Sequence, residues 1–182
     1  MSKFVALNSF IAITFVLFFM LNQWAFQSFH VTETISWVFL PAGLRLFYVL
    51  VYRWSALPGI FLGSLVADLI YLPNESYVFD ASLALASTLN PLIALLIVER
   101  TSKYMTLSLE NINLRIIMTL AILQAFFCTT LHHLIFLFFD KIPQPELFYD
   151  LISMFVGDLI GISLMMTGLT LFFKLVLLRY KH

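Results

Sequence analysis

The chain has 182 residues, of which 62% are hydrophobic and 11% charged, and its 10 basic and 10 acidic side chains balance to a formal net charge of zero. So few charged groups cannot cover the surface of a soluble domain of this size, and the composition indicates an all-α integral membrane protein whose surroundings are the lipid bilayer. It leaves no room for a soluble catalytic domain or a nucleic-acid-binding domain.

Six apolar segments approach the roughly 20 residues that a membrane-spanning helix needs. They cover about 4–23, 35–52, 57–73, 79–98, 115–138 and 148–173. The first resembles a signal peptide, but its apolar run is long and no small-residue cleavage site follows it, so we expect it to be retained. The second and third are short and are joined by a tight turn, which predicts an antiparallel hairpin. We expect one transmembrane domain over residues 1–182.

The polar connections between these segments predict an orientation. Residues 99–114 form the longest connection and are compatible with a helix lying in the membrane interface. Eight of the nine Lys and Arg side chains outside the spans fall on one side: Lys3, Arg53, Arg100, Lys103, Arg115, Lys174, Arg179 and Lys181, against Lys141 alone on the other. The positive-inside rule then places both termini in the cytoplasm, with the acidic residues Glu33, Glu75, Asp80, Asp140, Glu146 and Asp150 on the outer side of the membrane.

Three charged side chains lie well inside the predicted spans, away from the span ends, namely Arg45, Asp68 and Asp158. A charge at mid-bilayer costs roughly 2.5 kcal/mol or more, so such residues usually face a partner or a watery cavity. At 1.5 Å per residue, Asp68 and Asp158 lie about 17 and 18 Å from the cytoplasmic ends of their helices, and Arg45 lies about 12 Å from its own. The three are therefore able to form a cluster.

The chemistry of such a cluster stays open at this point. One arginine against two carboxylates leaves a surplus of negative charge, which a shared proton, a bound cation or a cationic ligand would neutralise. The alternatives are a structural Arg–Asp pair that fixes helix packing, with the other Asp protonated, and three unrelated placements.

Two prolines accompany these charges. Pro41 lies one turn before Arg45, with Gly43 between them, and Asn90 precedes Pro91 in the fourth segment. A proline inside a membrane helix frees a carbonyl one turn back, which then coordinates a ligand or a water, or only kinks the helix. We therefore group Asn90 with Arg45, Asp68 and Asp158 as the candidate binding residues.

Small residues recur at four-residue spacing in two segments. Gly59, Gly63 and Ala67 follow one another in the third segment, and Gly157 and Gly161 form a GxxxG in the sixth. This spacing lets two transmembrane backbones approach closely, either within the chain or along the seam of a homodimer.

The sequence indicates no enzyme, no cofactor and no metal centre. His132 and His133 are adjacent and point about 100° apart on a helix, so they make a poor metal motif and indicate an interfacial position or a pH-responsive role. Cys128 is the only cysteine and is expected to be a small core residue. Paired intramembrane aspartates occur in membrane aspartyl proteases, but the residues typical of such sites do not surround Asp68 and Asp158.

Four short motifs resemble, in order, the first of the bacterial membrane-associated sensor domains. They are Trp-Val-Phe-Leu-Pro-Ala-Gly-Leu at 37–44, Leu-Pro-Gly-Ile-Phe-Leu-Gly-Ser at 57–64, Ser-Thr-Leu-Asn-Pro-Leu at 87–92 and Met-Phe-Val-Gly-Asp-Leu-Ile-Gly at 154–161. The resemblance implies an integral sensor module with a mostly undefined ligand, of a kind usually fused to a histidine kinase or a cyclic-di-GMP enzyme. Pro41, Gly43, Gly63 and Asp158 match the family pattern, and no catalytic role comes with them.

The chain also departs from that family. It has six predicted spans where about eight are usual, it carries Arg45 in the second span, and it stops at His182 without an output domain. The sequence therefore predicts a stand-alone sensor or binding module that acts through a separate protein partner or as a homodimer. The alternatives are a small transporter or substrate-binding membrane subunit of an importer, and an accessory subunit of a larger membrane complex.

Overall fold

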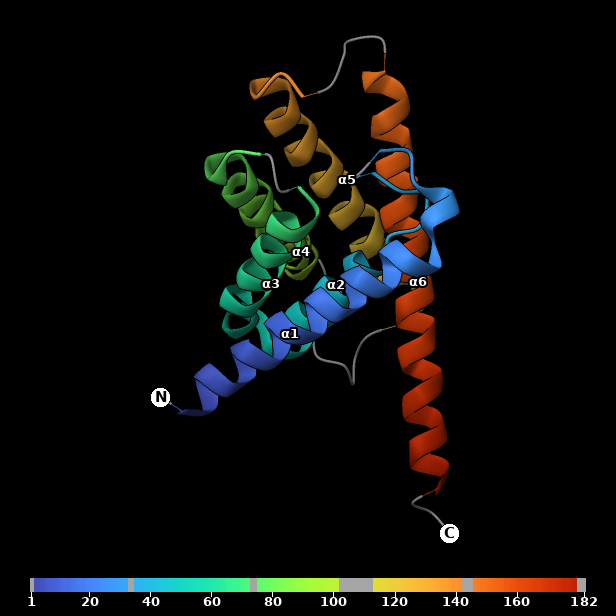
Figure 1. The fold of residues 1–182 in the computed structure, drawn as a ribbon. Helices are drawn as coiled ribbons and strands as arrows, with labels where there is room; N and C mark the ends of the chain where they lie inside the picture. The colour runs from blue at the N-terminus through green and yellow to red at the C-terminus, as the bar shows by residue number, and fades with distance from the viewer. Residues whose placement is uncertain (1, 33–34, 73–74, 102–112, 142–145, 180–182) are drawn as a thin grey trace.

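The computed structural model describes residues 2–32, 35–72, 75–101, 113–141 and 146–179, and the interfacial helix predicted within 99–114 falls largely outside them. Six α-helices form the fold (Figure 1): α1 (Ser2–Ala25), α2 (Leu40–Tyr52), α3 (Leu57–Tyr71), α4 (Tyr77–Thr101), α5 (Leu114–Phe138) and α6 (Leu147–Arg179). Short 3-10 turns follow α1 (η1, Gln27–Phe29) and α2 (η2, Arg53–Ala56). The predicted all-α class is confirmed.

Among the described residues, five helical segments are long and apolar enough to cross a membrane: Ser2–Ala25, Leu40–Tyr71, Tyr77–Thr101, Leu114–Phe138 and Leu147–Leu171. The second of these combines α2, η2 and α3, because α2 has 13 residues and α3 has 15, each fewer than the roughly 20 that a full span needs. The outward face of α1 is apolar as well, with Phe10, Ile13 and Leu17 each more than half exposed, as expected of a surface that faces lipid.

The second helix begins later than the sequence predicts. Residues 35–39 are not helical, and α2 starts at Leu40 with Pro41 in its first turn. A proline is favoured there because the first amide groups of a helix have no intrahelical partner in any case. The expectation that Pro41 frees a carbonyl inside the helix is therefore wrong, since no helical turn precedes it.

Two buried asparagines of α1 set the positions at which α2 and α3 begin. The Asn22 side-chain oxygen accepts a hydrogen bond from the Leu40 amide at 2.9 Å, and the Asn8 oxygen accepts one from the Gly59 amide at 2.6 Å. The two asparagines are 14 residues apart, or about 21 Å along α1, and the 13 residues of α2 cover about 20 Å. Helix α2 thus runs back along α1, and α3 starts at the Asn8 end.

The antiparallel hairpin predicted for α2 and α3 is wrong. The two helices diverge from η2, where Arg53 has a φ of 52°, and they make no extensive contact with each other. Helix α3 packs on α1 and α4, while α2 packs mainly on α6. In Figure 1, α1 crosses obliquely in front of these elements.

The GxxxG of α6 holds an extended segment instead of a second helix. A methyl group added to Gly161 would collide with the Phe39 carbonyl oxygen and lie 3.0 Å from the Leu40 nitrogen. One added to Gly157 would collide with the Ser36 carbonyl oxygen, and the Phe39 amide donates a 3.1 Å hydrogen bond to the Gly157 carbonyl. Both glycines are therefore covered within the chain and are not available to the seam of a homodimer.

The other small residues also serve internal packing. A Cβ on Gly59 would lie 2.8 Å from the Asn8 carbonyl oxygen, and one on Gly63 would lie 2.9 Å from the Phe15 Cβ. Gly43 faces α6, where a Cβ would lie 3.0 Å from the Gly161 carbonyl oxygen. These glycines let α3 approach α1 closely, and α2 approach α6.

Ion pairs mark the two ends of the bundle. At one end Arg53 donates to both Glu99 carboxylate oxygens at 2.8 and 2.7 Å. At the other, Lys141 forms an ion pair with Glu75 and lies 5.5 Å from the centre of the Phe79 ring. We refer to these as the Arg53 end and the Glu75 end. The beginnings of α4 and α6 lie toward the top of Figure 1, and the beginning of α1 and the end of α6 toward the bottom.

Candidate functional site

A buried pair of opposite charges joins α2 to α6. The Arg45 Nη2 atom lies 3.8 Å from the Asp158 Oδ1 atom, and each residue is 1% exposed. A buried ion pair gains stability only when its geometry is good and its remaining polar atoms are hydrogen-bonded. The contacts around these two side chains therefore decide what the pair does.

The pair is loose, and its polar atoms are incompletely satisfied. A charge-assisted N–H···O bond is typically about 2.7–2.9 Å long, and 3.8 Å is well beyond that. Within the described part of the chain, neither Asp158 oxygen meets the distance and angle of a hydrogen bond, and neither does the Arg45 Nε. Besides Arg45, the Cys128 thiol, a weak donor, interacts with Asp158. The guanidinium instead donates to the Cys128 sulfur at 3.5 Å and lies 5.5 Å from the centre of the Phe39 ring.

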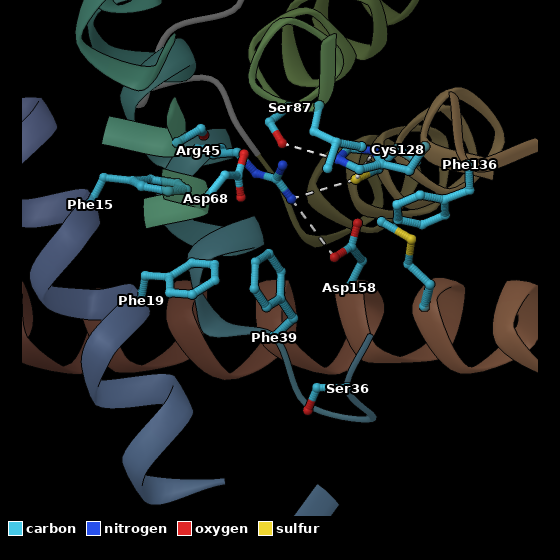
Figure 2. A pocket seen from close by; sticks show the side chains of 14 residues that line it. Phe15, Phe19, Ser36, Phe39, Arg45, Asp68, Ser87, Cys128, Phe136 and Asp158 are labelled. Carbon is cyan, nitrogen blue, oxygen red and sulfur yellow. Dashed lines mark hydrogen bonds and ion pairs between the residues drawn. The ribbon is translucent and has the colours of Figure 1, made fainter. Parts of the chain in front are cut away.

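A cavity of about 50 Å³ lies beside this pair (Figure 2). Its main polar lining comes from α2 to α6: Arg45, Asp68, Ser87, Cys128, His132 and Asp158. One water needs about 10–15 Å³ of such volume, so the cavity has room for a few waters or a small ion. Pockets for organic ligands usually measure roughly 300–1,000 Å³, and this one is far smaller.

Asp68 lines the cavity from α3. It is partly buried, and in Figure 2 its carboxylate is drawn next to the Arg45 side chain. It interacts electrostatically with Arg45, although the ion pairs of the described residues do not include one between the two. Three of the four predicted binding residues thus border one cavity.

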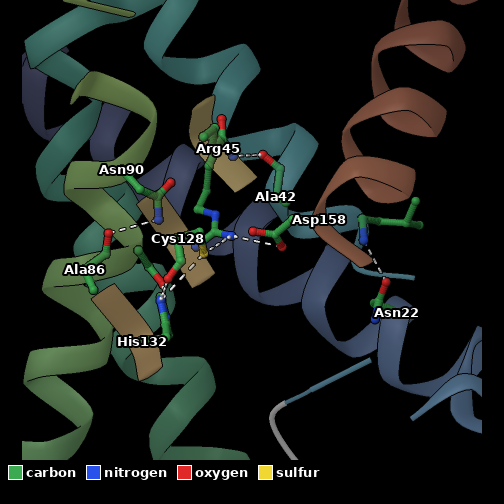
Figure 3. Close-up of polar contacts among 11 residues, drawn as sticks. Asn22, Ala42, Arg45, Ala86, Asn90, Cys128, His132 and Asp158 are labelled. Carbon is green, nitrogen blue, oxygen red and sulfur yellow. Dashed lines mark hydrogen bonds and ion pairs between the residues drawn. The ribbon is translucent and has the colours of Figure 1, made fainter. Parts of the chain in front are cut away.

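The fourth, Asn90, is not brought into the cavity. Its amide nitrogen donates to the Ala86 carbonyl in α4 at 3.0 Å, as Figure 3 shows, and it is not among the residues that line the cavity. The neighbouring Pro91 lies inside α4 and has no amide hydrogen, which leaves the Ser87 carbonyl without its usual helical donor. Pro91 therefore frees the backbone carbonyl of Ser87, a residue that lines the cavity, while Asn90 itself does not reach the cavity.

Sequence reasoning missed the contribution of α5. His132 is buried at 7% exposure instead of interfacial; its Nδ1 lies 2.8 Å from the Cys128 carbonyl oxygen and its Nε2 lies 3.2 Å from the Ser87 hydroxyl. Because a carbonyl only accepts, Nδ1 carries the hydrogen and Nε2 accepts from Ser87. Gln124, Cys128 and His132 recur every fourth residue and so share one helix face, which is the signal that would have identified them.

Two acidic residues predicted to lie outside the membrane are buried in helices. Helix α4 begins at Tyr77, so Asp80 lies in its first turn and is 1% exposed, with no hydrogen-bond partner for either oxygen among the described residues. Asp150 lies in the first turn of α6 at 3% exposure and interacts electrostatically with His133 of α5. The interior of the bundle near the Glu75 end therefore contains two more buried carboxylates than the sequence analysis predicts.

Comparison with protein-family models, curated proteins and solved structures finds no match for this chain. The resemblance to the membrane-associated sensor domains therefore stays a prediction from short motifs. The geometry does give each of its matched positions a physical role: Pro41 begins α2, Gly43 and Gly63 allow close helix packing, and Asp158 faces Arg45.

Proposed function

We propose that this chain is an integral sensor or binding module of a bacterial inner membrane that detects a small positive species in the Arg45–Asp158 cavity. The observation that carries the proposal is the buried Asp158 carboxylate, whose two oxygens have no hydrogen-bond partner although Arg45 is adjacent. A buried acceptor of this kind is stabilised by any group that brings positive charge or hydrogen-bond donors. The volume of the cavity favours a proton, a small cation or a few waters over an organic metabolite.

The proposed orientation has both termini in the cytoplasm after six crossings, with α2 and α3 as two short crossings. The positive-inside rule supports this orientation, because it puts the Arg53 end, where the basic side chains outside the spans are expected, on the cytoplasmic side and the Glu75 end outside. In this orientation the cavity lies nearer the outer side, since Asp68 is three residues from the end of α3 at Tyr71.

The proposed mechanism couples the cavity to α6. A species bound beside Asp158 weakens or replaces its attraction to Arg45, and this changes how α2 packs on α6 at Gly43 and Gly161. Asp158 lies 21 residues before the end of α6 at Arg179, or about 32 Å along the helix. In Figure 1 this helix extends well beyond the other helices. A shift of α6 would therefore be presented to a partner protein in the cytoplasm.

The experiment is thermal unfolding of the purified protein in lipid nanodiscs, over a pH series and with sodium, potassium or ammonium chloride at constant ionic strength. A species that binds only the folded protein at a hundred times its dissociation constant stabilises it by about 2.7 kcal/mol. We expect a shift of the unfolding temperature in the wild type that Asp158→Asn abolishes. The matched control is Arg53→Gln with Glu99→Gln, which removes an Arg–carboxylate pair elsewhere and leaves the shift intact.

Other outcomes favour the alternatives. If no pH or cation effect depends on Asp158, the cavity is not a binding site and an accessory structural subunit becomes the better proposal. If proteoliposomes instead carry protons or cations across the membrane in an Asp158-dependent manner, the chain is a small transporter.

A further inference from the structure

A row of carboxylates connects the Glu75 end with the cavity. Asp68 lies three residues before the end of α3, and Asp80 lies three residues after the start of α4. These two helices pack on each other, and α4 begins shortly after α3 ends, so they run antiparallel. Both side chains therefore lie about 4.5 Å from the joined ends of their helices, at the same level. Asp80 interacts electrostatically with Glu75, and Asp68 with Asp80 and Arg45.

The buried part of this row carries more negative than positive charge. Glu75 is matched by Lys141, which leaves Asp80, Asp68 and Asp158 against the single guanidinium of Arg45. Asp80 and Asp158 are each 1% exposed, and none of their four oxygens has a hydrogen-bond partner among the described residues. Unpaired buried carboxylates cost several kcal/mol each, so the row requires positive charge from outside.

A proton satisfies this requirement better than a metal ion. A metal cation needs several oxygen ligands around it, and the Arg45 guanidinium beside Asp68 and Asp158 would repel it. A proton binds a single oxygen, needs no coordination shell and removes the repulsion between two neighbouring carboxylates.

We infer that protons enter from the Glu75 end through Asp80 and Asp68 and are the species detected at the Arg45–Asp158 cavity, an inference that rests on the function proposed above. A hydronium ion at the Glu75 end gives its proton to a carboxylate oxygen of Asp80 and leaves as water. The Asp80 O–H bond then breaks as the proton bonds to Asp68, directly or through a water. Asp80 returns to the carboxylate, and Asp68 holds the proton at the wall of the cavity.

The surrounding titratable groups are compatible with this route. Helix α5 presents His132 and His133 toward the interior, and both Nδ1 atoms lie 2.8 Å from carbonyl oxygens of their own helix. Asp150 of α6 interacts with His133, and Lys141 holds Glu75. Among the described residues the His133 Nε2 atom and both Asp80 oxygens have no hydrogen-bond partner. Of these two residues, Asp80 is the one that interacts with Asp68 at the cavity.

The test uses infrared spectroscopy of the full chain in liposomes of determined orientation, with a rapid pH drop on one side. We expect a carboxylic-acid carbonyl band to appear when the pH falls on the Glu75 side. Asp80→Asn and Asp68→Asn should slow its appearance roughly a hundredfold, the low end of what a positioned proton-transfer group contributes. Asp80→Glu keeps a carboxyl group and should keep a fast rate. Glu146→Gln, an exposed acid at the same end, is the control and should behave as wild type.

The outcomes separate this inference from the function on which it rests. If Asp80→Asn and Asp68→Asn take up protons as fast as Glu146→Gln while Asp158→Asn loses the stability response, the route is wrong and the proposed function stands. If the wild type takes up no proton but keeps an Asp158-dependent response to a metal cation, the inference that the detected species is a proton is wrong, and the proposed function stands with a cation as the ligand. If Asp158→Asn responds as the wild type does, both proposals fail. A slow Asp80→Asn together with a fast Asp80→Glu supports the route and excludes a folding defect.

Discussion

Substitution of the α6 glycines tests the packing on which the site depends. Gly161→Ala would place a methyl group against the Phe39 carbonyl oxygen, with the Leu40 nitrogen 3.0 Å away. Both atoms belong to backbone, so no side-chain rotation relieves the collision. The segment that leads into α2 has to move away from α6, and with it the start of the helix that carries Arg45.

The expected cost follows from the type of contact. Overpacking of a well-packed interior typically costs about 1–3 kcal/mol, and a rigid backbone neighbour places this substitution at the upper end, at about 3 kcal/mol. Gly168 lies seven residues further along the same helix, and a Cβ there would meet nothing within 4 Å. Gly168→Ala should therefore stabilise α6 by a few tenths of a kcal/mol up to about 1 kcal/mol, because alanine is the better helix former.

Equilibrium unfolding of both variants in the same mixed micelles measures this difference. We expect Gly161→Ala to be less stable than Gly168→Ala by about 3 kcal/mol, the cost of the collision, because the gain in helix propensity is common to both variants. Equal stability of the two variants would refute the conclusion that residues 36–40 are held on the GxxxG face. The same conclusion would be refuted if Gly161→Ala formed less dimer and Gly168→Ala formed more, with the folding stability of both unchanged. Gly161 would then face a second copy of the chain.

Three further tests, of one or two substitutions each, have defined outcomes in the same unfolding assay. Asp158→Asn should cost about 3–5 kcal/mol, because it removes the carboxylate that forms the ion pair with the buried Arg45 guanidinium, and adding Arg45→Met should recover much of that loss; additive effects would show that the two residues are not coupled. Asn22→Ala should cost about 1 kcal/mol by removing the cap of α2, and no loss would contradict the capping bond. Arg53→Gln with Glu99→Gln should cost about 1 kcal/mol or less, since Arg53 is partly exposed; a loss as large as that of Asp158→Asn would contradict the distinction drawn between the two pairs.

The features that depend on composition and helix geometry could be predicted from the sequence. The length and hydropathy of the segments indicated the all-α class, and the cost of an intramembrane charge singled out Arg45, Asp68 and Asp158. Counting residues along each helix also put the carboxylates of Asp68 and Asp158 near one level. These arguments need only the rise per residue and the chemistry of single side chains.

The rest depends on contacts between segments that are distant in the sequence. The start of α2 at Leu40 depends on Asn22, 18 positions earlier, and on the α6 glycines more than 100 residues later. Asn8 and Asn22 look like isolated polar residues in an apolar helix until their partners are known. Asp80 is the second residue of the predicted segment 79–98 and was placed outside with the acidic loop residues. Helix α4 begins two residues earlier, at Tyr77, and Asp80 is buried in its first turn.

Amide hydrogen exchange can show whether the occupant of the Arg45–Asp158 cavity changes how α2 packs on α6. The Phe39 amide, which bonds to the Gly157 carbonyl at 3.1 Å, reports on that contact. Exchange should be measured in nanodiscs at two pH values and corrected for the intrinsic pH dependence, in the wild type and in Asp158→Asn. We expect protection of residues 36–40 to differ between the two pH values in the wild type and not in Asp158→Asn. Unchanged protection in the wild type, or the same change in both proteins, would contradict the proposed mechanism.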